Sequence, residues 1–121
     1  MNPPFALIIE DDPDLSDIFS EALSVAGYET RVIQDGKVAY DTLDSVDPVV
    51  IVLDLHLPNV SGETILTKIN ATEKFAKTRV IVTTADTVTA ELLRDKADII
   101  LQKPISFGQL RDIASRLKPN K

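Results

Sequence analysis

Polar side chains follow four apolar runs of this sequence, at the point where each run ends. In chain order they are Glu10-Asp11-Asp12, Asp54, Thr84-Ala85 and Lys103-Pro104. Carboxylates that lie close together repel one another, and each is pushed toward protonation unless a cation joins them. Oxygen ligands without histidine or thiolate select a hard ion, and Mg²⁺ takes one or two carboxylates while keeping places for water and phosphate. If the four run ends converge, they predict an acidic Mg²⁺ site.

The same groups suit phosphoryl transfer, because an aspartate can act as a nucleophile and form an aspartyl-phosphate. Asp54 is the candidate acceptor. Lys103 is the candidate ammonium that, with the metal ion, offsets charge on the phosphoryl oxygens. Thr84 is the candidate hydroxyl donor, and Ala85 leaves space beside it. Each residue type alone is common at a strand end, so the prediction depends on their joint occurrence in this order.

Composition excludes several other kinds of site. The 121 residues include no cysteine, which rules out disulfides, thiolate metal sites and cysteine nucleophiles. His56 is the only histidine, so a multi-histidine metal site is excluded as well. The formal net charge of −6 argues against a domain that binds nucleic acid through a basic face. The apolar run at 5–9 is short and ends in three acids, so it is neither a signal peptide nor a membrane span, and we expect a cytoplasmic protein.

The apolar runs have the lengths of strands. Those at 5–9, 49–53, 80–82 and 99–101 are continuous, as expected for strands covered on both faces, and the mixed run at 29–33 suits a place nearer an edge. Helical patterns fill the gaps: Leu15 to Ala26, including Ile18; Val38 to Val46; Ile65 to Ile69 after a Ser61 cap; Val88, Leu92 and Leu93 after an Asp86 or Thr87 cap; and Phe107 to Leu117 after a Ser106 cap. This alternation predicts a parallel sheet with helices on both faces, whose working site lies beyond the carboxyl ends of the strands.

The chain length fits one domain around one buried core. We expect a single domain over 1–121, in which 118–121 forms a loose tail. Asp12, which precedes Pro13, is expected to cap the first helix.

Four segments resemble the receiver domains of two-component response regulators. The family's first strand ends in an acidic pair, which is similar to Leu7-Ile8-Ile9-Glu10-Asp11-Asp12 here. Its phosphorylation motif is similar to Val52-Leu53-Asp54-Leu55-His56-Leu57-Pro58-Asn59-Val60-Ser61-Gly62. Its hydroxyl-plus-small-residue step is similar to Val82-Thr83-Thr84-Ala85, and its lysine–proline pair to Gln102-Lys103-Pro104. The resemblance covers essentially the whole chain, and the combination of motifs is highly specific.

The resemblance implies a flavodoxin-like α/β fold of the chemotaxis-regulator type, with a doubly wound, five-stranded parallel sheet in the order 2-1-3-4-5. It also implies that Asp54 receives a phosphoryl group from the phosphohistidine of a sensor histidine kinase or a histidine phosphotransfer protein. Phosphorylation would then shift an equilibrium between two surface conformations and change partner binding.

The resemblance also implies roles for the other site residues. The implied Mg²⁺ ligands are Asp11, Asp54 and the backbone carbonyl of His56, with Glu10 acting through a bound water. Thr84 and Lys103 would contact the phosphoryl group, with Ala85 and Pro104 beside them. The Lys103-Pro104 peptide would be cis, which a proline permits. Counting from the apolar run favours Glu10 and Asp11 as the acidic pair, and Asp12 remains an alternative second acid.

Three places depart from the family's commonest pattern. Ile100 stands where receivers that switch an output face usually carry Tyr or Phe, and it suits a core position. The segment from Thr84 to Lys103 is short by about one helical turn, so we expect a brief fourth helix. His56 and Asp86 flank the route of water to an aspartyl-phosphate, and we hypothesise that they set its lifetime; the alternative is an exposed pair without a kinetic role.

The leading functional prediction is a phosphorylatable signalling receiver that is not a metabolic enzyme. We expect it to bind neither nucleic acid nor membrane, and to be a monomer or a weak phosphorylation-dependent dimer. Two alternatives stay open: a small Mg²⁺-dependent phosphohydrolase that uses the Asp54 nucleophile, and a degenerate receiver that binds partners without phosphorylation. The first lacks room for a substrate cap, and the intact acidic, hydroxyl and lysine residues argue against the second.

Overall fold

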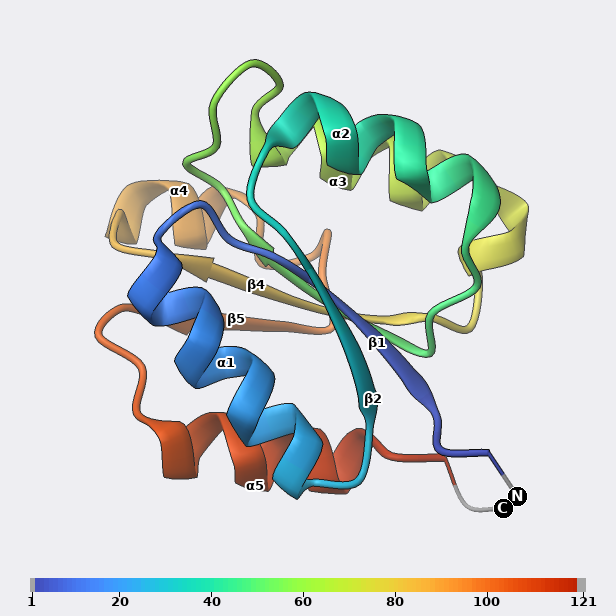
Figure 1. Ribbon diagram of the computed structural model, residues 1–121. Coiled ribbons are helices and arrows are strands. Elements are labelled where there is room, and N and C mark those ends of the chain that lie inside the picture. The colour runs from blue at the N-terminus through green and yellow to red at the C-terminus, as the bar shows by residue number, and fades with distance from the viewer. Residues whose placement is uncertain (1, 120–121) are drawn as a thin grey trace.

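The computed structural model describes residues 2–119, which form an α/β fold around one parallel sheet (Figure 1). Its strands are β1 (Phe5–Ile9), β2 (Glu29–Ile33), β3 (Val50–Asp54), β4 (Arg79–Thr84) and β5 (Ile99–Gln102). They pair in parallel in the order β2-β1-β3-β4-β5. The predicted fold class and strand order are therefore confirmed, and the mixed run at 29–33 is an edge strand as expected.

Five helices connect and follow the strands. They are α1 (Pro13–Val25), α2 (Gly36–Thr42), α3 (Gly62–Ala71), α4 (Thr87–Leu92) and α5 (Phe107–Leu117), with short 3₁₀ turns at Leu43–Ser45 and Glu73–Phe75. Each helix begins after a side chain that accepts hydrogen bonds from its first turn, as preferred N-cap residues do. These caps are Asp12, Asp35, Ser61, Asp86 and Ser106. The caps predicted at Asp12, Ser61 and Ser106 are confirmed, and Asp86 is the one that caps α4.

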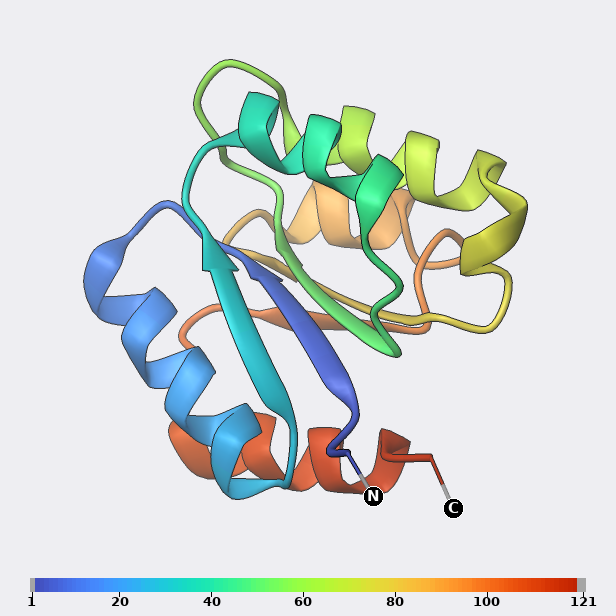
Figure 2. The same cartoon turned by 45° about the vertical axis from the view of Figure 1, so that its right-hand side comes forward.

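The helices form two layers, one on each face of the sheet (Figures 1 and 2). Alternate strand residues point to opposite faces, so each strand contributes to two cores. Ala6, Ile8 and Val52 pack under α1 and α5, whereas Leu7 and Leu53 pack under α2 and α3. The sheet is therefore covered on both sides, as its continuous apolar runs require.

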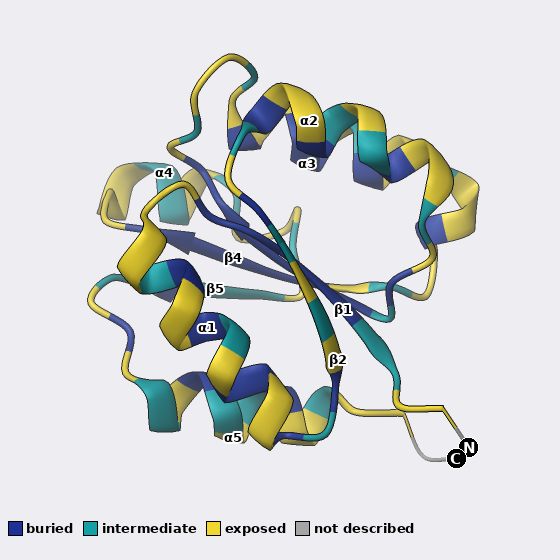
Figure 3. Ribbon diagram, in the orientation of Figure 1, coloured by how far each residue is buried: buried dark blue, intermediate teal, exposed yellow. Residues whose placement is uncertain are grey.

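Figure 3 shows exposed residues along the outer faces of the helices. Four apolar residues that the sequence patterns assigned to buried helix faces are exposed too. The exposed fractions are 41% for Ile18, 51% for Val38, 66% for Val88 and 74% for Leu92. In α1 and α2 the next residue along, Phe19 or Ala39, is buried, as the same patterns predicted. In α4 the helix has six residues, none of them buried, and Leu93 just after it packs against the core instead.

Between residues 2 and 119 there is no helix both long and apolar enough to cross a membrane. Of the tail predicted at 118–121, Lys118 and Pro119 are exposed, and 120–121 lie outside the described residues. That 1–121 forms a single domain stays a prediction.

Candidate functional site

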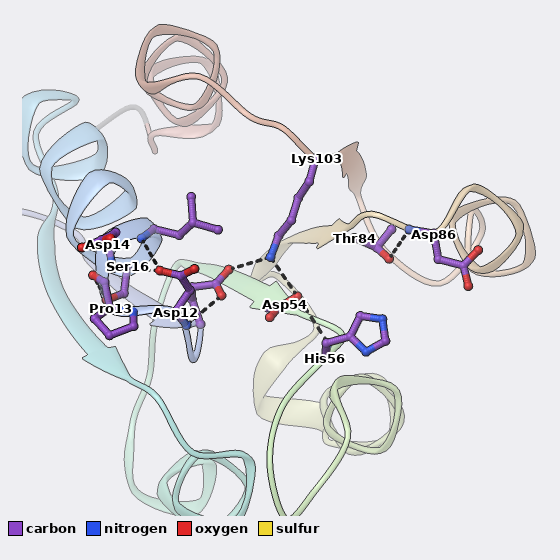
Figure 4. A network of polar contacts seen from close by, with 11 residues as sticks. Asp12, Pro13, Asp14, Ser16, Asp54, His56, Thr84, Asp86 and Lys103 are labelled. Atoms are coloured by element: carbon purple, nitrogen blue, oxygen red, sulfur yellow. Dashed lines mark hydrogen bonds and ion pairs between the residues drawn. The ribbon is translucent and has the colours of Figure 1, made fainter.

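The polar residues that follow the strands meet at the carboxyl edge of the sheet (Figure 4). Glu10 follows β1 and is 1% exposed, and Asp54 ends β3 and is 2% exposed. Thr84 ends β4 and is 1% exposed, and Lys103 follows β5. Because the strands are parallel and in register, their ends deliver these groups to one place, as the sequence predicted.

Lys103 joins the two buried carboxylates. Its Nζ donates to Glu10 Oε1 at 3.1 Å and to Asp54 Oδ1 at 3.3 Å, and its side chain is 21% exposed. Burial lowers the pKa of Lys103, but attraction to Asp54 and Glu10 outweighs burial, so the pKa is raised overall. The side chain therefore stays an ammonium. Its backbone N–H also donates to the Thr84 carbonyl at 2.8 Å, which ties the end of β5 to β4.

One ammonium does not balance the two carboxylates. Burial raises the pKa of Glu10 to about 7, and the charge of Asp54 adds to this effect, although a hydrogen bond from the backbone N–H of Asp12 opposes it. Burial likewise raises the pKa of Asp54, against the opposing charge of Lys103. Both carboxylates are thus harder to ionise than in water, which is what a buried acidic site shows when a further cation is needed.

Carboxylate oxygens of Glu10, Asp11 and Asp54 lie within 4.8 Å of one another. This oxygen-only set suits a hard cation such as Mg²⁺. The Asp12 side chain is used elsewhere, because its Oδ1 accepts from the N–H groups of Asp14 at 2.9 Å and Leu15 at 3.2 Å. Of the two candidates for the second acid, Asp11 therefore belongs to the cluster, whereas Asp12 caps α1.

The backbone after Asp54 turns back toward its own side chain. The N–H of His56 donates to Asp54 Oδ1 at 3.3 Å, and the imidazole is exposed. This hydrogen bond brings the His56 backbone to the acidic site, where its carbonyl is the expected further ligand.

Thr84 and its neighbours form the other side of the site. The Thr84 Oγ1 accepts from the N–H of Asp86 at 3.1 Å, and the exposed Ala85 lies between them with only a methyl group. Hydrogen bonds from the Thr89 hydroxyl and backbone keep the pKa of the exposed Asp86 low, and the charge of His56 contributes slightly. Figure 4 shows His56 and Asp86 on the same side of Asp54, toward the viewer's right.

Pro104 follows Lys103 through a cis peptide bond, as the resemblance implied. Pro104 itself is exposed.

A contact between two loops was missed from the sequence. Asn59 has a positive φ of 74°, and its side-chain amide donates to Asp35 in the loop before α2. The N–H of Gly36 donates to the Pro58 carbonyl at 3.0 Å, and a Cβ at Gly36 would collide with the Val60 carbonyl. The sequence signals were the Asp35-Gly36 turn and the Pro58-Asn59 pair, which are typical of turns but do not reveal that the turns touch.

The chain matches the family model described as "Response regulator receiver domain" over residues 6–115. It is 32% identical over 111 residues to the transcriptional regulatory protein TrcR of Mycobacterium tuberculosis, covering 90% of this chain and 43% of that protein. It is also 32% identical over 117 residues to the sensor histidine kinase TmoS of Ectopseudomonas mendocina, covering 94% of this chain and 12% of the kinase. The chain thus spans less than half the length of each of these relatives.

Among solved structures, the chemotaxis response regulator CheY4 of Vibrio cholerae superposes with a TM-score of 0.85. The match covers 96% of this chain and 99% of CheY4 at 21% identity, and at this identity it shows that the two chains share a fold. The family match, by contrast, rests on sequence and includes all four segments that carry the site residues. The chain belongs to the receiver domains of two-component response regulators.

Proposed function

We propose that Asp54 is the phosphoacceptor and that its phosphorylation by a phosphohistidine switches the binding of a protein partner. The observation that carries the proposal is the surroundings of this carboxylate. Asp54 is 2% exposed, has the Lys103 ammonium at 3.3 Å, and shares an acidic cluster with Glu10 and Asp11. A buried carboxylate placed between an ammonium and a cation site has the groups that phosphoryl transfer requires.

In the proposed reaction, a carboxylate oxygen of Asp54 attacks the phosphorus of the phosphohistidine. The O–P bond forms as the N–P bond breaks, and the released imidazole nitrogen takes up a proton from solvent. The Lys103 ammonium moves from the carboxylates to the phosphoryl oxygens, where the negative charge now lies. The Thr84 hydroxyl donates a hydrogen bond to one phosphoryl oxygen. Ala85 leaves room for the phosphoryl group, and Pro104 follows the Lys103 that contacts it. Hydrolysis of the product returns the Asp54 carboxylate and inorganic phosphate.

Mg²⁺ fits the donor set, which consists of oxygens from Asp11, Asp54 and the His56 carbonyl, with Glu10 acting through water. When bound, the ion neutralises charge on the phosphoryl oxygens and so lowers the barrier to attack.

The role in signalling follows from the family. The donor is a sensor histidine kinase or a histidine phosphotransfer protein, and the downstream partner is a protein. We propose a single cytoplasmic domain that acts as a monomer or a weak phosphorylation-dependent dimer, binds neither nucleic acid nor membrane, and has no metabolic activity. The phosphohydrolase alternative would need a cap that selects among phosphate esters, and residues 2–119 form only the five-stranded sheet with its helices and connecting loops.

The test is to incubate the chain with Mg²⁺ and acetyl phosphate and to follow its mass. We expect one added phosphoryl group, bound as an acyl phosphate that hydroxylamine releases, and none in Asp54→Asn. Phosphorylation that persists in Asp54→Asn would contradict the assignment of the acceptor. Rapid turnover of several phosphate esters would favour the hydrolase instead, and no reaction with any donor would favour the degenerate receiver.

A further inference from the structure

Thr83 has a buried hydroxyl that the fold does not use. The residue is 0% exposed, and its Oγ1 is the one buried side-chain nitrogen or oxygen atom without a hydrogen-bond partner among residues 2–119. A buried hydroxyl without a partner is destabilising, and a valine of the same shape would avoid that cost. The stability of the fold therefore does not explain why a threonine stands here.

The position of Thr83 in the sheet places it beside the acceptor carboxylate. Asp54 and Thr83 are direct partners in the pairing of β3 with β4. Val52 and Ile81, two residues earlier in each strand, pack in the core under α1 and α5. Because side chains alternate along a strand, Asp54 and Thr83 point to that same face, on strands about 4.8 Å apart. Thr84 points to the other face.

The Lys103 side chain reaches from the end of β5 past β4 to Asp54. In the sheet, β4 lies between β5, which precedes Lys103, and β3, which carries Asp54. Figure 4 shows the Lys103 side chain extending toward Asp54, and its ammonium contacts both Asp54 and Glu10. The ammonium has three hydrogens to donate, and contacts to Glu10 and Asp54 account for two of them. An unpartnered acceptor, the Thr83 hydroxyl, thus lies on the strand that Lys103 spans.

We propose that Thr83 is a positioning residue for phosphoryl transfer, whose hydroxyl accepts a hydrogen bond from Lys103 once the ammonium has turned toward the phosphoryl group. This inference rests on the proposed function of Asp54. When Asp54 carries a phosphoryl group, its esterified oxygen no longer bears the charge that holds Lys103. Thr83 then supplies a neutral acceptor on the same face, which keeps the ammonium from swinging into solvent and directs its remaining hydrogens to the phosphoryl oxygens.

The test compares Thr83→Val, which removes the hydroxyl at nearly constant shape, with Thr83→Ser, which retains it. Binding of beryllofluoride, a phosphoryl mimic, is titrated by NMR in the presence of Mg²⁺, and urea unfolding is measured without either. Hydrogen bonds to charged groups are strong enough that we expect Thr83→Val to bind beryllofluoride at least about tenfold more weakly. Thr83→Ser should stay within about twofold of the parent chain. The midpoint of urea unfolding for Thr83→Val should be equal to or above that of the parent, and its Mg²⁺ affinity should be unchanged.

Two results would overturn the inference. One is beryllofluoride binding by Thr83→Val that equals that of the parent. The other is weaker binding that accompanies a lower unfolding midpoint, because the hydroxyl would then serve the fold. Failure of the proposed function looks different: the parent chain itself would bind no beryllofluoride and accept no phosphoryl group at Asp54, and the role of Thr83 would be refuted with it.

Discussion

Lys103 Nζ lies 3.3 Å from Asp54 Oδ1, although 49 residues separate the two in the chain. The same ammonium lies 3.1 Å from Glu10, so a single cation serves two buried carboxylates. This imbalance makes the site responsive to protons, metal ions and phosphoryl groups, each of which changes its charge.

The first prediction concerns pH. Burial raises the pKa of Glu10 from 4.5 to about 7 in the folded chain. Between these values the folded state binds more protons than the unfolded state, so the free energy of unfolding should fall as the pH rises from about 5 to 8. We expect a loss of roughly 2 kcal/mol in the absence of divalent ions, measured by urea unfolding at several pH values.

Mg²⁺ should reverse this loss, because a cation stabilises the ionised carboxylates that the higher pH produces. The matched control is Glu10→Gln, which removes the titrating group and should flatten the profile. A parent chain whose stability rises from pH 5 to 8 without Mg²⁺ would show that Glu10 is not destabilised by burial.

The second prediction separates Asp11 from Asp12. Asp11→Asn should weaken Mg²⁺ binding at least about tenfold, measured by calorimetry, because it removes a carboxylate ligand. Asp12→Asn should leave Mg²⁺ binding unchanged, since Asp12 caps α1 and asparagine is an equally good cap. Asp12→Ala should lower the free energy of unfolding by about 1 kcal/mol while leaving the metal site intact. The reverse pattern would make Asp12 the ligand.

The sequence predicted those features of the fold that depend on neighbouring residues. Four continuous apolar runs and the mixed run at 29–33 located the five strands to within about one or two residues. Single residues such as Ser61 and Ser106 located helix starts, because a cap bonds to a backbone only three residues away. The order of the strands followed from the family resemblance, whereas the convergence of Glu10, Asp54 and Lys103 followed from a parallel sheet, whose strands end at one shared edge.

What the sequence did not predict depends on residues that are distant in the chain. The hydrogen bond between Asn59 and Asp35 joins loops 24 residues apart, and the sequence of neither turn indicates that it contacts the other. Val88 and Leu92 are exposed because the six-residue α4 buries none of its residues. The apolar pattern of α4 alone does not reveal how the helix packs on the sheet. The lack of a partner for the buried Thr83 hydroxyl depends on the strands and helices that pack against β4, which lie elsewhere in the chain.

The third prediction concerns α4. Leu92 is 74% exposed, whereas its neighbour Leu93 packs against the core. Leu92→Ala should therefore change the free energy of unfolding by less than about 0.5 kcal/mol, and Leu93→Ala should lower it by roughly 1–2 kcal/mol. The pair is its own control, because the same substitution is made at adjacent positions and measured by urea unfolding. Equal losses at both would mean that α4 rotates from the orientation described.

The fourth prediction concerns the lifetime of the phosphorylated state. His56 and Asp86 lie on the same side of Asp54 (Figure 4), and hydrogen bonds from Thr89 keep the pKa of Asp86 low, so its carboxylate is charged at neutral pH. A carboxylate or imidazole here can orient water toward the phosphorus, so Asp86→Asn and His56→Ala should each slow dephosphorylation. Asparagine retains the cap of α4, so a change in Asp86→Asn reports the charge rather than a loss of the helix start. Release of inorganic phosphate from the purified phosphoprotein gives the rate. Lifetimes equal to that of the parent in both variants would reduce the two residues to an exposed pair without a kinetic role.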